Sequence, residues 1–120
     1  MDEKNIYICA TMDTKGDEAM YLKKQIEACG NRAYLIDIAL RSTPKRYAVD
    51  FTQEQVAQAA TVSFSRVLET TLRSEASKYM AAGLTALTRR LLQEKKLDGI
   101  ISLGGSGGTT IATSAMQQLP

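Results

Sequence analysis

Three short segments along the chain are dominated by apolar and often β-branched residues. They cover residues 6–10, 33–38 and 99–103, and the first of them contains no charged position. Runs of this kind are typical of strands that helices cover on both faces of a parallel sheet. The first run therefore predicts a central strand, and the other two predict a second and a third strand.

The segment after the first strand has the spacing of a helix. Ala19, Leu22, Ile26 and Cys29 recur at intervals of three and four residues and form one apolar face. Gly30 follows them at the position where helices commonly end. A strand, this helix and a second strand form a βαβ unit, which predicts parallel strands and a right-handed crossover.

Two further helical regions are expected between the second and third strands. Thr52 and Gln55 have the spacing of a capping box, which predicts a helix over residues 53–60. Residues 65–96 continue with an apolar stripe at helical spacing, and Gly83 weakens that pattern in its middle. Two helices or one kinked helix satisfy this pattern equally.

These elements predict an α/β fold of the Rossmann-like, three-layer α/β/α type around a parallel sheet with the strand order 2-1-3. Three strands are few for such a sheet, in which about five or more are usual. We therefore expect residues 1–120 to be a single α/β domain that is truncated before its remaining strands.

The composition excludes several classes of site. The 120 residues include 15 Lys+Arg, 13 Asp+Glu and no histidine. Without histidine the chain has no Ser-His-Asp or Cys-His pair, no imidazole base and no His-ligated metal. A net charge of +2 with few aromatic residues argues against a nucleic-acid partner.

The cysteines and the lengths of the apolar runs indicate where in the cell the protein is expected. Cys9 and Cys29 form neither a metal motif nor a disulfide framework, and we expect both to be buried, reduced thiols. No apolar run approaches the roughly 20 residues of a membrane helix, and the polar, acidic N-terminus does not resemble a signal peptide. The sequence therefore predicts a soluble, cytoplasmic protein with no membrane partner.

The most distinctive local feature is a glycine-rich segment between the third strand and a final helix, which is expected over residues 111–118. The segment consists of Gly104, Gly105, Ser106, Gly107, Gly108, Thr109 and Thr110. Glycine lets backbone N–H groups approach an anion, and the following helix adds unpaired donors and its dipole. The segment therefore predicts a phosphate- or carboxylate-binding site, and a turn without a ligand is the alternative.

Enzyme motifs fit the same segment less well. No Lys-Ser/Thr pair follows its last glycine, as a Walker A loop requires, and Thr110 stands where a dinucleotide fingerprint has its third glycine. The pattern G-x-S-x-G around Ser106 is that of a hydrolase nucleophile elbow. Because this chain has no histidine to act as base, we interpret Ser106 as a phosphate-contacting hydroxyl.

A second candidate segment follows the first strand. It contributes Thr11, Asp13, Thr14, Lys15 and Gly16. In the order 2-1-3, the ends of strands one and three flank the crevice where open α/β sheets bind ligands. Lys15 suits a phosphate and Asp13 suits a magnesium ion or a ribose hydroxyl, although solvated loop charges or a helix cap explain them equally. Asp37 is a weaker candidate, for which a structural role is favoured.

The two segments together resemble those of an uncharacterised protein family whose best-known plant member is the tomato mosaic virus resistance protein. The resemblance rests on Asp13, Thr14, Lys15 and Gly16, on residues 104–109, and on Ala115, Met116, Leu119 and Pro120. It covers essentially the whole chain and implies that residues 1–120 are the N-terminal part of a nucleotide-binding α/β domain, namely the Rossmann-like, ATP-binding N-terminal domain of a longer protein. Ala10, Met12 and Ser74 depart from the family pattern, which leaves the ligand geometry of the first segment open.

From the residues and the resemblance we expect a module that binds a nucleotide or another phosphate-bearing small molecule, with ATP and magnesium as its cofactors. The first alternative is an enzyme that acts on a small phosphorylated or carboxylated metabolite, with Asp13 or Lys15 as acid or base. The second is an assembly domain, because an unpaired sheet edge favours homo-oligomers.

Overall fold

The computed structural model describes residues 3–44, 46–104 and 106–119, and it describes the backbone alone at positions 106, 107 and 109. The elements are β1 (Asn5–Ala10), α1 (Met12–Ala28), β2 (Arg32–Asp37), α2 (Gln53–Ala59), α3 (Phe64–Glu69), α4 (Arg73–Gln93), β3 (Gly99–Leu103) and α5 (Ser106–Met116). The predicted α/β fold is confirmed.

The strands form one parallel sheet in the order β2-β1-β3. In the centre of the sheet, Ile8 of β1 pairs with Leu35 of β2 on one side and with Ile101 of β3 on the other. The strand order therefore reverses between β1 and β3. In open α/β sheets, the carboxyl ends of the strands at such a reversal border the ligand-binding crevice.

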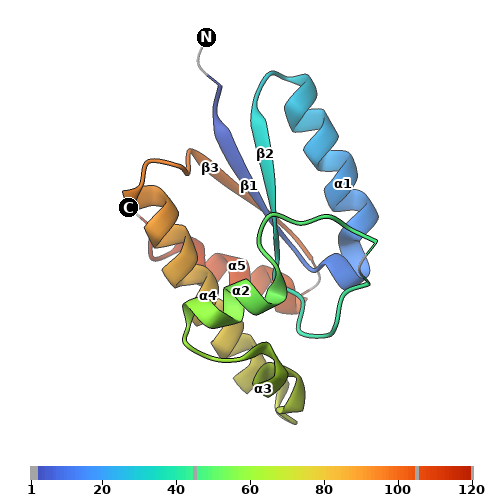
Figure 1. The fold of residues 1–120 in the computed structure, drawn as a ribbon, viewed down its shortest axis with the longest axis vertical. Coiled ribbons are helices and arrows are strands. Elements are labelled where there is room, and N and C mark those ends of the chain that lie inside the picture. Colours follow the sequence, from blue (N-terminus) through green and yellow to red (C-terminus); the bar gives the residue numbers. More distant parts are fainter. Residues whose placement is uncertain (1–2, 45, 105, 120) are drawn as a thin grey trace.

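Helices cover both faces of this sheet, and Figure 1 shows α1 on one side and α2, α4 and α5 grouped on the other. Ile8 and Ala10 of β1 pack in one cluster with Ala19 of α1. Tyr7 and Cys9 point to the opposite face and pack in a second cluster with residues of α2, α3, α4 and α5. Because alternate side chains of β1 enter two different cores, its sequence has no polar alternation.

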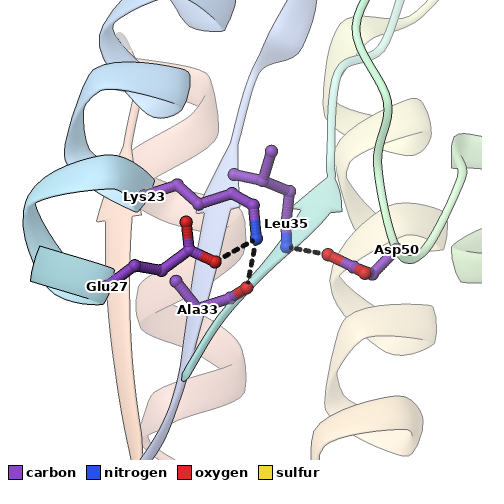
Figure 2. A network of polar contacts seen from close by, with 5 residues as sticks. All are labelled: Lys23, Glu27, Ala33, Leu35 and Asp50. Atoms are coloured by element: carbon purple, nitrogen blue, oxygen red, sulfur yellow. Dashed lines mark hydrogen bonds and ion pairs between the residues drawn. The ribbon is translucent and has the colours of Figure 1, made fainter. Parts of the chain in front are cut away.

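The outer edge of β2 is covered by side chains. Figure 2 shows the Nζ of Lys23 in α1 donating to the carbonyl of Ala33 (2.6 Å) and pairing with Glu27 (3.1 Å). On the same edge, the carboxylate of Asp50 accepts a hydrogen bond from the N–H of Leu35 (2.7 Å). These contacts protect β2 from pairing with another chain. No strand in the described part of the chain pairs with the far edge of β3.

Two helices begin earlier than the sequence pattern predicts. α1 starts at Met12, so residues 13–16 lie in its first turns, and Lys15 interrupts it with non-helical angles (φ −119°, ψ 19°). α5 starts at Ser106 instead of residue 111, which places most of the glycine-rich segment in its first turns. Both shifts bring candidate residues to helix N-termini, where N–H groups lack intrahelical partners.

The long helical region between β2 and β3 divides into α3 and α4 at residues 70–72, and not at Gly83. Thr70 ends α3 with extended angles (φ −67°, ψ 129°). A Cβ on Gly83 would overlap the carbonyl oxygen of Val56. Glycine at this position therefore permits α4 to pack closely against α2.

The two cysteines differ in environment, and the prediction that both are buried is wrong for Cys29. Cys9 lies in the core, and burial raises the pKa of its thiol to about 12. Cys29 is the exposed residue that follows the last turn of α1, and both thiols are free. Among the helices that the structure describes, none combines the length and apolar character needed to cross a membrane.

Candidate functional site

The segments that follow β1 and β3 touch each other directly. The N–H of Thr11 donates to the carbonyl of Leu103 (3.2 Å), which joins the start of α1 to the end of β3. A Cβ on Gly108 would come within 2.8 Å of Thr11 Cγ2, and a Cβ on Gly104 within 3.2 Å of Thr11 Oγ1. The two candidate segments therefore meet as the strand order predicts, and the absence of side chains at these glycines permits the approach.

A cleft of about 510 Å³ opens beside this contact, within the range of about 300–1,000 Å³ that is common for small-molecule sites. We name it the switch-point cleft. It is lined by Thr11, Asp13, Thr14, Ile38, Leu40, Arg41, Val67, Leu68, Thr70, Thr71, Arg73, Ala76, Gly108 and Ile111. Its walls thus come from the start of α1, the segment after β2, the end of α3, the start of α4 and the first turns of α5.

Three of the residues predicted after the first strand line this cleft. They are Thr11, Asp13 and Thr14. The hydroxyl oxygens of Thr11 and Thr14 lie 3.0 Å apart, and Asp13 is half-buried. This wall therefore presents two hydroxyl groups and one carboxylate at the N-terminus of α1.

The other two residues predicted in this segment make different contacts. The Nζ of Lys15 pairs with the carboxylate of Glu18 at 3.7 Å, and both side chains are about half exposed. Gly16 is buried beneath the ring of Tyr47, which a Cβ on Gly16 would overlap. The Tyr47 hydroxyl donates to Asp17 (2.8 Å). Gly16 therefore has a packing role, and neither residue is part of the cleft lining.

The glycine-rich segment contributes one wall of the switch-point cleft through Gly108. Gly104 packs against Thr11, and Thr110 is exposed on the first turns of α5. The backbone of Gly107 belongs to the same helix. Gly105 lies outside the described residues, as do the side chains of Ser106 and Thr109. Because α5 begins here, the positive end of its dipole lies beside the cleft.

Asp37 joins β2 to the start of α1. Its Oδ1 accepts hydrogen bonds from the N–H of Met12 (3.4 Å) and the N–H of Ala39 (3.0 Å), and only 3% of the residue is exposed. Burial raises the pKa of this carboxyl, while the hydrogen bonds from the two N–H groups oppose the rise. These contacts give Asp37 the structural role that the sequence favoured.

Two arginines that the sequence did not indicate as site residues also line the switch-point cleft. Arg41 follows β2, and Arg73 is the first residue of α4. Within the described residues, neither guanidinium forms a salt bridge. Only the fold brings these positions to one cleft. The sequence alone marks Arg41 only as a basic residue after a strand, and Arg73 only as a basic residue at the start of a helix.

No group of three or more His, Cys, Asp or Glu side chains able to hold a metal occurs in the ranges that the structure describes. Asp13 is the one carboxylate among the residues that line the cleft. Magnesium is commonly bound by one or two carboxylates together with substrate phosphates.

The sequence of this chain is similar to a known protein family and to several of its members. The model of the "Uncharacterised protein family (UPF0261) N-terminal domain" matches residues 4–120. The chain belongs to this family. UPF0261 proteins from Clostridium tetani, Brucella suis and Rhizobium meliloti are 38%, 35% and 37% identical to it over 117, 115 and 117 residues.

The aligned regions cover 97%, 96% and 98% of this chain but 28%, 27% and 28% of those three relatives. The chain therefore spans just over a quarter of the length of these UPF0261 proteins. Their names state no activity, ligand or partner. The expectation of an uncharacterised family is confirmed, whereas the relation to the plant resistance protein and the binding of ATP stay predictions.

Proposed function

We propose that this UPF0261 domain binds the phosphate group of a small molecule, expected to be an ATP-like nucleotide, in the switch-point cleft. The observation that carries the proposal is the contact of Thr11 with Gly108, which brings the starts of α1 and α5 to the same cleft. Helix N-termini offer unpaired N–H groups and a positive dipole end to an anion. The hydroxyls of Thr11 and Thr14, which are hydrogen-bonded to each other at 3.0 Å, can redirect a donor to the ligand.

In this proposal the residues around the phosphate have distinct roles. The glycine-rich segment from Gly104 to Thr110 lets its backbone approach the phosphate oxygens. Asp13 contacts a magnesium ion that accompanies the ligand, or a ribose hydroxyl. Gly16 supports the start of α1 beneath Tyr47, and Lys15 adds positive charge nearby without direct contact.

The proposal is tested by calorimetric titration of the full-length protein with ATP and magnesium. Replacing Thr11 with Val keeps the shape of the side chain and removes its hydroxyl, so affinity should fall about tenfold. Thr113→Val, at an exposed position further along α5, is the matched control and should leave affinity unchanged. Absence of saturable binding to the unsubstituted protein would contradict the proposal.

Catalysis on a small phosphorylated or carboxylated metabolite is a second candidate, because Asp13 is the carboxylate that lines the cleft. We propose Asp13 as its acid or base, in preference to Lys15, whose ammonium group pairs with Glu18. Turnover of a metabolite that Asp13→Asn abolishes while binding persists would favour the enzyme. Binding without turnover across a panel of such metabolites would favour the binding module.

Homo-oligomer formation is a third candidate function. The observation behind it is the difference between the two sheet edges: side chains cover that of β2, and no described strand pairs with that of β3. Unpaired strand edges are sites of association between chains. A strictly monomeric mass in light scattering would exclude this candidate.

A further inference from the structure

We propose that the ligand of the switch-point cleft carries two separate anionic groups, the second of which binds Arg41 and Arg73. This inference rests on the proposed function, because it concerns the end of the same ligand that lies away from the start of α5. It narrows the ligand class to small molecules with a phosphate and at least one further anionic group.

The size of the cleft and the origin of its walls are the first argument. A phosphate group fills the room of only a few water molecules, each about 30 Å³, whereas the cleft measures about 510 Å³. Thr11 and Gly108 line it from the β1 and β3 side, while Arg41 and Arg73 line it from the segment after β2 and from α4. A ligand that reaches both regions therefore extends well beyond its first phosphate.

The charges of these walls are the second argument. Arg41 and Arg73 are exposed and have no ion-pair partner within the described part of the chain. Asp13 is the one acidic residue among those that line the cleft, so the lining contains two cations and a single carboxylate. Guanidinium groups match the oxygens of phosphate and carboxylate in a bidentate geometry.

The third argument is that the backbone carrying Arg41 is held in place. The buried side chain of Gln53 donates through Nε2 to the carbonyls of Ala39 (2.8 Å) and Arg41 (2.6 Å). Its Oε1 accepts a hydrogen bond from the N–H of Thr43 (3.2 Å). Fixing a binding segment before the ligand arrives lowers the entropic cost of association.

Apolar side chains lie between these polar regions in the lining. Leu40, Val67 and Ile111 are among them. Ligand sites commonly combine apolar walls with a few polar groups that fix orientation. A phosphate at α5, an organic body against these apolar residues and a second anion at Arg41 and Arg73 account for all three kinds of surface.

The inference is tested by titrating the full-length protein with AMP, ATP and adenosine 3′,5′-bisphosphate. AMP has one phosphate, ATP carries its further anions in a chain, and the bisphosphate carries its second anion on the ribose. At least one of the two larger probes should bind about tenfold more tightly than AMP. Arg41→Gln and Arg73→Gln should each remove most of that gain and leave the affinity for AMP within about twofold.

Arg89→Gln is the matched control, because Arg89 is exposed on α4 and does not line the cleft. It should leave the affinity for every probe unchanged. Equal affinities for all three probes, or a gain that survives both arginine substitutions, would overturn the inference and leave the proposed function standing. Absence of saturable binding of every probe would contradict the proposed function and the inference together.

Discussion

Gly83 is a poor helix-forming residue in the interior of α4, and the close packing of α4 against α2 explains why glycine stands there. Replacing a helical glycine with Ala gains about 1 kcal/mol in an open helix. Here the new Cβ would overlap the carbonyl oxygen of Val56 and push α4 away from α2. Overpacking costs about 1–3 kcal/mol, and the propensity gain offsets about 1 kcal/mol of it, so Gly83→Ala should lower the free energy of unfolding by up to about 2 kcal/mol in urea denaturation.

The control for this prediction is Ala82→Gly, at the exposed neighbouring position of the same helix. It should cost about 1 kcal/mol through helix propensity alone. A Gly83→Ala variant that is more stable than the unsubstituted protein would show that α4 and α2 are not in the close contact described.

Asp37 makes stability depend on pH in a defined direction. Burial raises the pKa of its carboxyl in the folded domain above the value of about 3.9 expected in the unfolded chain. The folded state therefore retains this proton to higher pH, and the associated stability is lost as pH rises through the raised pKa. Relative to the unsubstituted protein, Asp37→Asn should gain stability as pH increases across that window.

Urea denaturation of both proteins from pH 3 to pH 7 measures this difference. Glu69→Gln, at an exposed position, serves as the control and should follow the unsubstituted protein. A difference in stability between Asp37→Asn and the unsubstituted protein that is constant with pH, or that shifts in favour of the unsubstituted protein as pH rises, is incompatible with a carboxyl whose pKa is raised by burial.

The individual residues of the site could be predicted only where the strand order alone determines their position. Thr11, Asp13 and Gly108 were predictable because the ends of β1 and β3 must meet in the order 2-1-3. Arg41 and Arg73 were not, because no local motif marks them and the fold brings them together from separate elements.

At the scale of elements, the strands and the capped start of α2 were predictable, whereas the starts of α1 and α5 were not. Short apolar, β-branched runs identify β1, β2 and β3 without reference to tertiary contacts, although only β1 and β2 are largely buried. Four glycines in five residues instead predict a loop, because glycine weakens helices. α5 nevertheless starts at Ser106, and the close approach of Gly108 to Thr11 gives a packing reason for glycine there.

The capping box at the start of α2 stabilises this helix, and its contribution to the free energy of unfolding can be measured. Thr52 Oγ1 accepts from the N–H of Gln55 (3.2 Å), and Gln55 Oε1 accepts from the N–H of Thr52 (2.8 Å). Thr52→Ala should lower the free energy of unfolding by about 1 kcal/mol, because a side-chain acceptor at the N-cap is lost. Thr52→Ser retains the acceptor and should recover most of that loss in the same denaturation experiment. Equal stability of the two variants would argue against the cap.

At the scale of the whole molecule, the two edges of the sheet predict where chains would associate. Lys23 and Asp50 cover the edge of β2, whereas Ile101 of β3 is 37% exposed. If the third candidate function holds, light scattering shows a dimer, and Ile101→Lys shifts it to monomer because a charged edge side chain opposes pairing. A dimer that persists in Ile101→Lys would place the interface elsewhere on the domain.

Binding of a phosphate-bearing ligand between the starts of α1 and α5 is tested most directly by amide NMR during a titration with ATP and magnesium. We expect saturable shifts with one dissociation constant at Thr11, Asp13, Thr14 and Gly108, and no shift at the exposed Cys29 at the far end of α1. Shifts that do not saturate, or saturable shifts confined to residues outside the switch-point cleft, would contradict a phosphate site at this position.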